Sequence, residues 1–401
     1  MRILIVGQYF WPENFRINDL ALGLKERGHE VMVFTGKPNF PGGSFFEGYS
    51  MFGKSKESWN GITIYRAPLI QRGNGKGLSL IINYLSFAFF GSIKALFLDL
   101  KADIVLVYQQ SPVILALPGV IFKKKNSAKL FLYVQDLWPE SVLATTQIRN
   151  KFIIGSLDRF TRWLYRKSDT ILIQSLAFRD FLLNRDVPAQ KIVYLPNSAE
   201  GVYRKEDKRP DLAHFFKGSF HIVFAGTIGA AQDLKILIAA AKKVKAVDAG
   251  ISWVIIGDGR KKEELMELAV KEGVADVCRF TGFFPLEEMP FFFAYADAML
   301  VSLKKELIFS LTIPAKLQSY MACSKPVISA LDGEGSRIIE EAGCGFTGPS
   351  GDAEILAANV IAIKNMTQDK RNELGNRGYV YFQREFERNV LLAKLEKMLS
   401  A

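Results

Sequence analysis

Residues 309–345 combine helix starts, a buried strand and a glycine turn in an order that suits a phosphorylated ligand. The stretch reads FSLTIPAKLQSYMACSKPVISALDGEGSRIIEEAGCG. Pro314 is typical of the first turn of a helix, VISA predicts a short strand, and DGEG precedes a second helix. Both helices would begin at the carboxyl ends of parallel strands, where backbone N–H groups and the helix dipole attract anions. The pattern therefore predicts a site for a diphosphate.

A diphosphate enclosed by protein needs compensating positive charge. Two basic residues are candidates: Lys316, in the first turn of the Pro314 helix, and Arg260, in the turn after the predicted strand SWVIIGDG. Each can instead be an ordinary solvated charge. The turn after the predicted strand HIVFA contains Gly226 and Gly229. We expect the phosphates to lie near this turn and near the amides around Pro314.

Three further residues are candidates for contacts with the rest of such a ligand. Glu334, in the DGEG turn, can accept hydrogen bonds from hydroxyl groups of a ligand or can cap a helix that begins at Ser336. Phe283 and Phe284 follow Gly282 at a predicted strand end and are candidates for stacking on an aromatic ring of a ligand. Two aromatic residues at such a place are more often part of a core.

The first half of the chain offers one acidic candidate for catalysis. Asp136 follows the predicted strand KLFLYV, at the sheet edge where α/β folds place their chemistry, although it can also cap a helix that starts near Pro139. The first strand-to-helix loop and the PNFPGG loop supply polar residues that can bind a second substrate or cap their own loops. These residues are Glu13, Asn14, Arg16 and Asn39.

The elements that position these residues form two similar halves. Predicted strands such as RILIV, DIVLVYQ, HIVFA and SWVII alternate with amphipathic helices, which predicts parallel sheets with right-handed crossovers. A polar, turn-rich stretch at 196–211 separates the halves. At 401 residues and 49% hydrophobic content, the chain is long enough for two domains.

Motifs along nearly the whole chain resemble the GT-B glycosyltransferases of family 4. They are QYFWPEN, PNFPGG, QDLWPES, FAGTIG, IIGDGRKKEEL and PAKLQSYMACSKP. Their combination resembles a subgroup that includes L-fucosamine-type transferases of bacterial surface-polysaccharide synthesis. The resemblance implies an α/β GT-B fold, with two Rossmann-like domains whose parallel sheets face a central cleft. An acceptor-binding, membrane-facing domain would cover 1–196, a donor-binding domain 197–379, and a helix at about 380–401 would cross back to the first domain.

The activity implied by the resemblance is retaining transfer of a sugar from a nucleotide diphosphate, which we expect to be UDP, to a polyprenyl-diphosphate-linked glycan. No metal or other cofactor is implied. The chain departs from the family in two places. Ser319 stands where the second residue of a Glu-x7-Glu pair is usual, and the turn from Gly226 to Gly229 lacks the usual basic pair. These departures leave open a catalytically silent scaffold subunit of a polysaccharide-assembly complex. A nucleotide-sugar epimerase of GT-B fold is a further alternative. Such an epimerase would require carboxylates and histidines in the cleft, which the chain lacks.

Composition favours an anionic partner for the first half. The chain has a net charge of +11. Residues 1–200 contain 25 Lys and Arg against 15 Asp and Glu, which leaves only +1 for the remainder. No nucleic-acid-binding signature is present, so a membrane surface is the better candidate. Three cysteines without CxxC spacing and three histidines without HExxH predict no metal site and a reducing cytoplasm. The N-terminus begins with a predicted strand and not with a signal pattern.

The segment 76–101 bears most directly on membrane contact. On a helical wheel, its polar residues fall on one stripe and the remaining face is almost entirely Leu, Ile and Phe. The stripe consists of Lys76, Ser79, Asn83, Ser86, Lys94 and Lys101. Lys94 and Asp99 argue against a spanning helix. The segment is either a helix buried on the first sheet or a helix that dips into the membrane interface.

Basic residues around this segment favour anionic lipid. They are Arg66, Arg72, Lys123, Lys124 and Lys125. Residues 150–169 also interleave basic and aromatic side chains, as suits a headgroup layer or a half-buried helix. We therefore expect a cytoplasmic protein, peripheral at the inner face of the cytoplasmic membrane.

Overall fold

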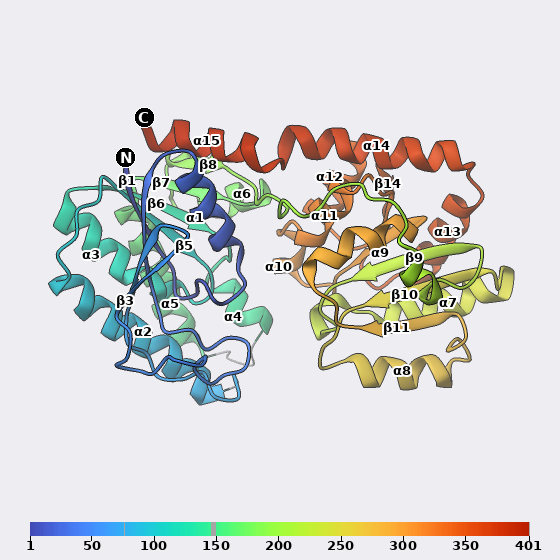
Figure 1. Ribbon diagram of the computed structural model, residues 1–401, viewed down its shortest axis with the longest axis horizontal. Helices are drawn as coiled ribbons and strands as arrows, with labels where there is room; N and C mark the ends of the chain where they lie inside the picture. The colour runs from blue at the N-terminus through green and yellow to red at the C-terminus, as the bar shows by residue number, and fades with distance from the viewer. Residues whose placement is uncertain (76, 146–149, 401) are drawn as a thin grey trace. The chain divides into compact units, whose positions relative to one another are not determined.

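The computed structural model describes residues 1–75, 77–145 and 150–400. It divides into two compact units, each with one central sheet between helical layers (Figure 1). Unit 1 contains Met1–Leu195 together with Leu392–Ala401, and unit 2 contains Pro196–Leu391. The C-terminal segment thus returns to unit 1.

Unit 1 is built on an eight-stranded sheet of order β3-β4-β2-β1-β5-β6-β7-β8, in which every pairing except β3 with β4 is parallel. Strands β1 and β5 are buried along almost their whole length, because helices cover both faces of a parallel sheet. The strands are β1 (Arg2–Val6), β2 (Glu30–Thr35), β3 (Lys56–Trp59), β4 (Ile62–Arg66), β5 (Ile104–Gln109), β6 (Lys129–Val134), β7 (Thr170–Ile173) and β8 (Ile192–Tyr194).

The helices of unit 1 lie on two faces of this sheet. Successive crossovers from β4 to β8 run in one direction, so right-handedness places α2, α3, α5 and α6 on one face and α1 on the other. Helix α15 packs near α1, where Arg27 pairs with Glu396 at 2.7 Å. The helices are α1 (Arg16–Glu26), α2 (Gly77–Phe97), α3 (Leu117–Asn126), α4 (Glu140–Thr145), α5 (Lys151–Lys167), α6 (Ala177–Leu183) and, from Leu392 onward, α15 (Arg388–Ser400).

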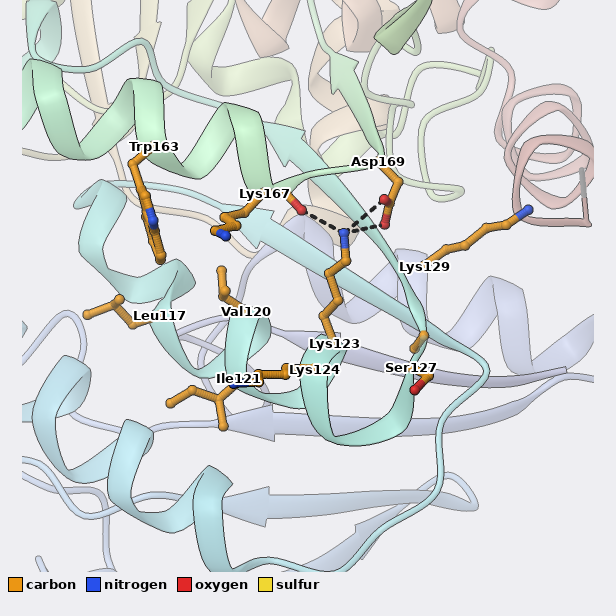
Figure 2. Close-up of a pocket in the computed structure, with 11 residues that line it drawn as sticks. Leu117, Val120, Ile121, Lys123, Lys124, Ser127, Lys129, Trp163, Lys167 and Asp169 are labelled. Carbon is orange, nitrogen blue, oxygen red and sulfur yellow. Dashed lines mark hydrogen bonds and ion pairs between the residues drawn. The ribbon is translucent and has the colours of Figure 1, made fainter.

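Two of the three consecutive lysines at the end of α3 hold neighbouring helices. The Nζ of Lys123 donates to the carbonyl of Lys167, at the end of α5, and to Asp169 (Figure 2). The Nζ of Lys125 donates to three carbonyls at the end of α2, those of Ala95, Leu96 and Leu98. Lysine side chains are well suited to such carbonyls, which have no partner within their own helix. Both lysines therefore join α3 to its neighbouring helices.

Unit 2 contains a six-stranded, fully parallel sheet of order β11-β10-β9-β12-β13-β14. The strands are β9 (Phe220–Ala225), β10 (Ile251–Ile256), β11 (Cys278–Gly282), β12 (Ala298–Ser302), β13 (Val327–Ala330) and β14 (Gly345–Phe346). The helices are α7 (Lys235–Val247), α8 (Lys262–Lys271), α9 (Met289–Tyr295), α10 (Leu307–Ser310), α11 (Ala315–Ala322), α12 (Glu334–Ala342), α13 (Ala353–Lys364) and α14 (Gln368–Glu385). The prediction of two parallel α/β domains is confirmed.

Helix α2 directs its polar stripe inward and its apolar face outward. Asn83 and Ser86 are buried, and Asn83 accepts from Gln8 at 2.8 Å and donates to the carbonyl of Ile70 at 2.6 Å. Lys94 donates to the carbonyl of Arg66 at 2.8 Å. The exposed apolar residues are Leu78, Ile81, Ile82, Leu85, Phe89, Ile93, Leu96 and Phe97.

The simple core-helix interpretation of α2 is therefore wrong, because a core helix would bury this apolar face. Helix α2 is long and apolar enough to cross a membrane by length and composition. Only 33% of its most apolar 18-residue stretch is buried in the protein. The bonds of Asn83 and Lys94 anchor the helix to unit 1. Lys76, which the sequence placed on the polar stripe, lies outside the described residues.

Candidate active site

Two helix N-termini lie side by side in unit 2, as the sequence predicted. Helix α11 follows β12 and α12 follows β13, and these two strands pair in parallel. A Cβ on Gly335 would lie 3.1 Å from the Cδ of Pro314, the N-cap of α11. Gly333, the N-cap of α12, has a φ of +74°, and a Cβ there would overlap the carbonyl of Ser310. Glycine at both positions allows the helix starts to approach.

The loops after β9 and β10 pack backbone against backbone beside this point. The N–H of Ile228 donates to the carbonyl of Asp258 at 2.8 Å. Gly257 has a φ of +135°, and a Cβ there would overlap the carbonyl of Gly226. Gly226 itself is exposed and has a φ of +136°, and Gly229 is the N-cap of the short turn Ala230–Gln232. The backbone around Gly226 is thus open to a ligand.

Lys316 stands between these features with a buried ammonium group. Its Nζ lies 3.7 Å from the centroid of the Phe224 ring and 3.2 Å from the position of a Cβ on Gly226. Tyr320, one turn later, exchanges hydrogen bonds with the backbone of Ala225 and so ties α11 to the end of β9. Among the described residues the Nζ of Lys316 has no hydrogen-bond partner.

Two physical effects disfavour a positive charge on Lys316. Burial lowers its pKa to about 7, and the positive end of the α11 dipole opposes a cation in the first turn. The face of the Phe224 ring offers partial compensation through a cation–π contact. A bound anion would supply the counter-charge that the protein itself does not.

Two further candidates in unit 2, Arg260 and Phe283, are exposed. Arg260 lines a hollow of about 550 Å³ whose walls include Lys262 and Phe280 but not Lys316. Phe283 follows β11 and is 75% exposed, so its ring is free to stack on a ligand. Phe284 belongs to the core, with its ring centroid 4.6 Å from that of Phe292.

Ser319 and Glu334 both make polar contacts inside unit 2, and the helix near Glu334 starts earlier than expected. Ser319 is 4% exposed, and its hydroxyl donates to the carbonyl of Ala315 in its own helix at 3.5 Å. Helix α12 begins at Glu334 and not at Ser336, which places this carboxylate one turn before Arg337. The two side chains pair through bonds of 3.0 and 3.1 Å, and Glu334 is 5% exposed. Ser319 and Glu334 are thus both packed within unit 2.

In unit 1, Glu13 organises loops at the carboxyl edge of the sheet. Its Oε1 accepts from the backbone N–H groups of Asn39 and Phe40, both at 2.8 Å, and its Oε2 accepts from Phe10 at 3.4 Å. Glu13 and Asn39 are 1% and 0% exposed. Of the two functions left open by the sequence, the structure favours loop capping for both. Asn14 is exposed and Arg16 half-buried, so these remain candidates for acceptor contacts.

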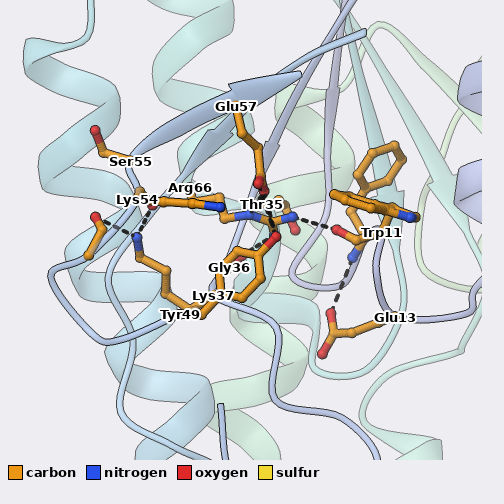
Figure 3. Close-up of polar contacts among 12 residues, drawn as sticks. Trp11, Glu13, Thr35, Gly36, Lys37, Tyr49, Lys54, Ser55, Glu57 and Arg66 are labelled. Atoms are coloured by element: carbon orange, nitrogen blue, oxygen red, sulfur yellow. Dashed lines mark hydrogen bonds and ion pairs between the residues drawn. The ribbon is translucent and has the colours of Figure 1, made fainter. Parts of the chain in front are cut away.

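A buried ion pair supports the same loops (Figure 3). Arg66 pairs with Glu57 and donates to the carbonyls of Gly36, at 2.9 Å, and of Trp11. Tyr49 donates to Glu57 at 2.9 Å. Arg66 is fully buried, so its predicted attraction to lipid is corrected. The sequence carried no signal for this pair, since Arg66 reads there only as a charge at a strand end.

Asp136 lies just beyond the carboxyl end of β6 and contacts Ser111, which follows β5. The hydroxyl of Ser111 donates to its Oδ2 at 2.8 Å and accepts from the Trp138 indole at 3.2 Å. Burial raises the pKa of Asp136. Helix α4 begins only at Glu140, and the recorded partner of the carboxylate is Ser111 and not a helix N–H group. Strands β5 and β6 pair in parallel, with Gln109 opposite Val134 at their ends. Because Ser111 and Asp136 follow these two residues, this pairing could have indicated Ser111 as a partner of Asp136.

Sequence comparison assigns each unit to a known domain family. Residues 205–381 match the family described as glycosyl transferases group 1, and residues 14–198 match the glycosyl transferase 4-like domain. The chain is a glycosyltransferase. The two matches together cover both units, so the glycosyltransferase has the two-domain organisation of the GT-B fold.

Named relatives and solved structures agree with this assignment. The glycosyltransferase is 27% identical to "Probable glycosyltransferase WbjE" of Pseudomonas aeruginosa, over 69% of this chain and 70% of that one. It is 24% identical to "Putative colanic acid biosynthesis glycosyl transferase WcaI" of Escherichia coli, over 80% and 81%. Anabaena Alr3699/HepE in complex with UDP superposes with a TM-score of 0.72, at 14% identity and over 100% of both chains. WaaG, a glycosyltransferase of lipopolysaccharide biosynthesis, gives a TM-score of 0.70, also at 14% identity and over 100% of both chains.

Replacing Glu13 in this glycosyltransferase is expected to destabilise unit 1. Glu13→Ala would leave buried N–H groups unpaired and should lower the free energy of unfolding by about 1–3 kcal/mol, whereas Glu13→Gln should cost less. Chemical denaturation monitored by circular dichroism measures both effects. An unchanged unfolding free energy in Glu13→Ala would contradict the loop-capping function.

The same residue gives a pH dependence with a defined sign. Burial raises the pKa of Glu13 from 4.5 to about 7. Protonation of Glu13 therefore contributes stability that is fully present below about pH 4.5 and is lost as pH rises through about 7. The stability of the wild type relative to Glu13→Gln should fall across this window.

Proposed function

We propose that this glycosyltransferase moves a sugar from a UDP-linked donor to a glycan carried on polyprenyl diphosphate, with retention of anomeric configuration. The observation that carries the proposal is the buried Nζ of Lys316, which has no hydrogen-bond partner in the described part of the chain and lies beside two helix N-termini and an open glycine loop. A structural relative supports the donor, since HepE was solved with UDP and with UDP-glucose. Relatives named for colanic acid and lipopolysaccharide biosynthesis support surface polysaccharide as the product class.

In this proposal the donor diphosphate binds to the N–H groups at the start of α11 and near Gly226, and Lys316 provides the charge. Phe283 is exposed and available for the nucleobase, and Arg260 is a second cation in the loop that packs against the Gly226 loop. Among the described residues, no group of three or more His, Cys, Asp or Glu side chains is placed to hold a metal ion. The site in unit 2 therefore offers helix dipoles and an ammonium group for the leaving phosphate.

The acceptor is proposed to bind at the carboxyl edge of the unit 1 sheet. Asp136 is the catalytic candidate there, because it is a polar group in a desolvated position. In a transfer on one face of the sugar, the departing phosphate oxygen can take the proton of the acceptor. The enzyme then has to position the acceptor hydroxyl and to stabilise charge. Asn14 and Arg16 are proposed to contact the rest of the acceptor.

A catalytically silent scaffold is the second candidate function, favoured by the absence of the Glu-x7-Glu pair. A transfer assay separates the two functions. Purified protein is incubated with UDP-sugars and with extracted lipid-linked glycans, and release of UDP is followed together with the mass of the glycan. Sugar-dependent release with a matching gain of mass supports the enzyme. Saturable UDP binding without any transfer would support the scaffold.

We further propose that unit 1 contacts an anionic membrane surface through the outward face of α2. Its exposed residues recur at helical spacing, so they form one apolar stripe along 21 residues. Polar side chains on the opposite face anchor α2 to the sheet and loops. Residues 1–200 also carry 25 basic against 15 acidic residues, which attracts anionic lipid. This arrangement suits a helix that lies in the interface.

The membrane proposal predicts a loss of vesicle binding when the stripe is made polar. The triple variant Leu78→Ser, Leu85→Ser, Phe89→Ser should bind anionic vesicles at least about tenfold more weakly, because each side chain loses apolar area that would be buried. Phe87 is left intact, since it is fully buried and its loss would unfold unit 1. Co-sedimentation with vesicles gives the affinities.

A matched control changes three exposed apolar residues of unit 2: Val247→Ser, Val270→Ser and Leu307→Ser. Circular dichroism has to show that both triple variants are folded. Equal vesicle affinity in the α2 variant, the control and the wild type would overturn the proposed membrane contact of α2.

A further inference from the structure

A groove of about 810 Å³ lies between α3 and α5 on unit 1, on the sheet face that also carries α2 (Figure 2). The proposed sugar transfer makes no use of this groove. Its lining contains one apolar wall and several ammonium groups. The lining residues are Leu117, Val120, Ile121, Lys123, Lys124, Ser127, Ala128, Lys129, Trp163, Lys167 and Asp169.

The charge of the groove is strongly positive. The lining contains four lysines and one aspartate, which gives a net charge of +3. Asp169 is already compensated, because it pairs with Lys123 at 2.8 Å and accepts from the N–H of Leu130 at 2.7 Å. Among the residues that the structure describes, Lys124 and Lys167 are both exposed and make no side-chain ion pair. These two ammonium groups are available to an anion.

The apolar wall lies beside these lysines. Leu117, Val120, Ile121 and Lys124 follow one another at helical spacing, so they share one face of α3. Figure 2 shows Trp163 of α5 across the groove from Leu117, with its ring directed toward α3. All three apolar side chains of α3 and Trp163 are half-buried. An occupant would therefore meet ammonium groups and an apolar surface together.

We propose that the groove between α3 and α5 binds the phosphate headgroup of an anionic phospholipid, with the first methylenes of its acyl chain against Trp163. Ammonium groups bind phosphate as point charges, and tryptophan is suited to the boundary between headgroup and hydrocarbon. Helix α3 packs against α2, so the groove and the apolar stripe belong to neighbouring helices of unit 1. The inference rests on the proposed membrane contact and gives it a lipid-specific site.

Vesicle binding tests the lipid preference with the full-length chain. Wild-type protein should bind vesicles of phosphatidylcholine that include phosphatidylglycerol more tightly than vesicles of phosphatidylcholine alone. The variant Lys124→Gln, Lys167→Gln should lose at least about fivefold of this preference and retain its binding to phosphatidylcholine, because α2 is intact. The control Lys394→Gln, Lys397→Gln removes the same charge from the exposed part of α15, which packs near α1. If both variants lose the preference for phosphatidylglycerol equally, or if neither loses it, the proposed lipid site in the groove is overturned.

A second measurement separates the groove from the membrane contact of α2. The indole N–H signal of Trp163, assigned with Trp163→Phe, is followed by NMR during titration with dihexanoyl-phosphatidylglycerol below its micelle concentration. We expect a saturable shift that disappears in Lys124→Gln, Lys167→Gln. The same shift with inorganic phosphate would show a free-phosphate site, and no shift with either probe would show an unoccupied groove. Either result overturns the lipid proposal, even if α2 binds vesicles.

Discussion

Replacing Lys316 by alanine is expected to weaken UDP binding by about 1.5–3 kcal/mol, the range for a hydrogen bond to a charged group. This corresponds to a loss of about 10- to 150-fold in affinity. The effect should be large because the Nζ of Lys316 is buried and no described residue is its hydrogen-bond partner, so a bound diphosphate would be its main counter-charge. Isothermal titration calorimetry measures the affinity. Lys305→Ala is the matched control, since Lys305 is an exposed lysine of the same unit.

Lys316 also predicts how UDP affinity depends on pH. Its pKa is lowered to about 7 by burial, and a bound diphosphate would raise it by favouring the charged form. Binding would then take up a proton, and UDP affinity should fall by up to about tenfold per pH unit as pH rises above 7. The Lys316→Ala variant should show a flatter profile. Unchanged affinity in this variant, together with an unchanged profile, would remove Lys316 from the donor site.

Replacing Asp136 by asparagine is expected to lower kcat by about 10²- to 10⁴-fold, the range for a group that acts in proton transfer or charge stabilisation. Affinity for UDP should stay nearly unchanged, because Asp136 belongs to unit 1 and the proposed diphosphate site to unit 2. Asparagine keeps the size of the side chain and can still contact Ser111. Steady-state transfer kinetics and UDP titration measure the two quantities separately.

Ser111→Ala is the companion variant for Asp136. It removes the hydrogen bond to Oδ2 and leaves the carboxylate in place, so we expect a smaller loss of kcat. Wild-type kcat in a folded Asp136→Asn variant would assign Asp136 a structural function only.

The architecture could be predicted from the sequence because its signals are local. Alternating buried strands and amphipathic helices predicted two parallel sheets, and Pro314 with the DGEG turn predicted two adjacent helix starts. Helix α12 was placed two residues late, since Glu334 and not Ser336 is its first residue. Capping signals such as serine do not distinguish a residue at the start of a helix from one inside its first turn.

The choice between the alternatives that the sequence left open depends on contacts between distant parts of the chain. Glu13 and Asn39 are polar loop residues in the sequence, and only the fold shows that Glu13 accepts from the N–H of Asn39. For helix α2, the sequence predicted the helix itself but not its orientation on the sheet. A helical wheel separates its polar and apolar faces but does not indicate which face meets the sheet. The burial of Asn83 in bonds with Gln8 and Ile70 decides this.

Thermal denaturation with nucleotides tests the central claim, that unit 2 binds a nucleoside diphosphate donor, most directly. Wild-type protein is heated alone and with UDP, GDP, TDP or CMP. We predict that UDP raises the Tm in a saturable manner, as expected for a ligand that binds only the folded state, and that the shift is reduced in Lys316→Ala but not in Lys305→Ala. An unchanged Tm with all four nucleotides, confirmed by the absence of heat in a UDP titration, would contradict the account.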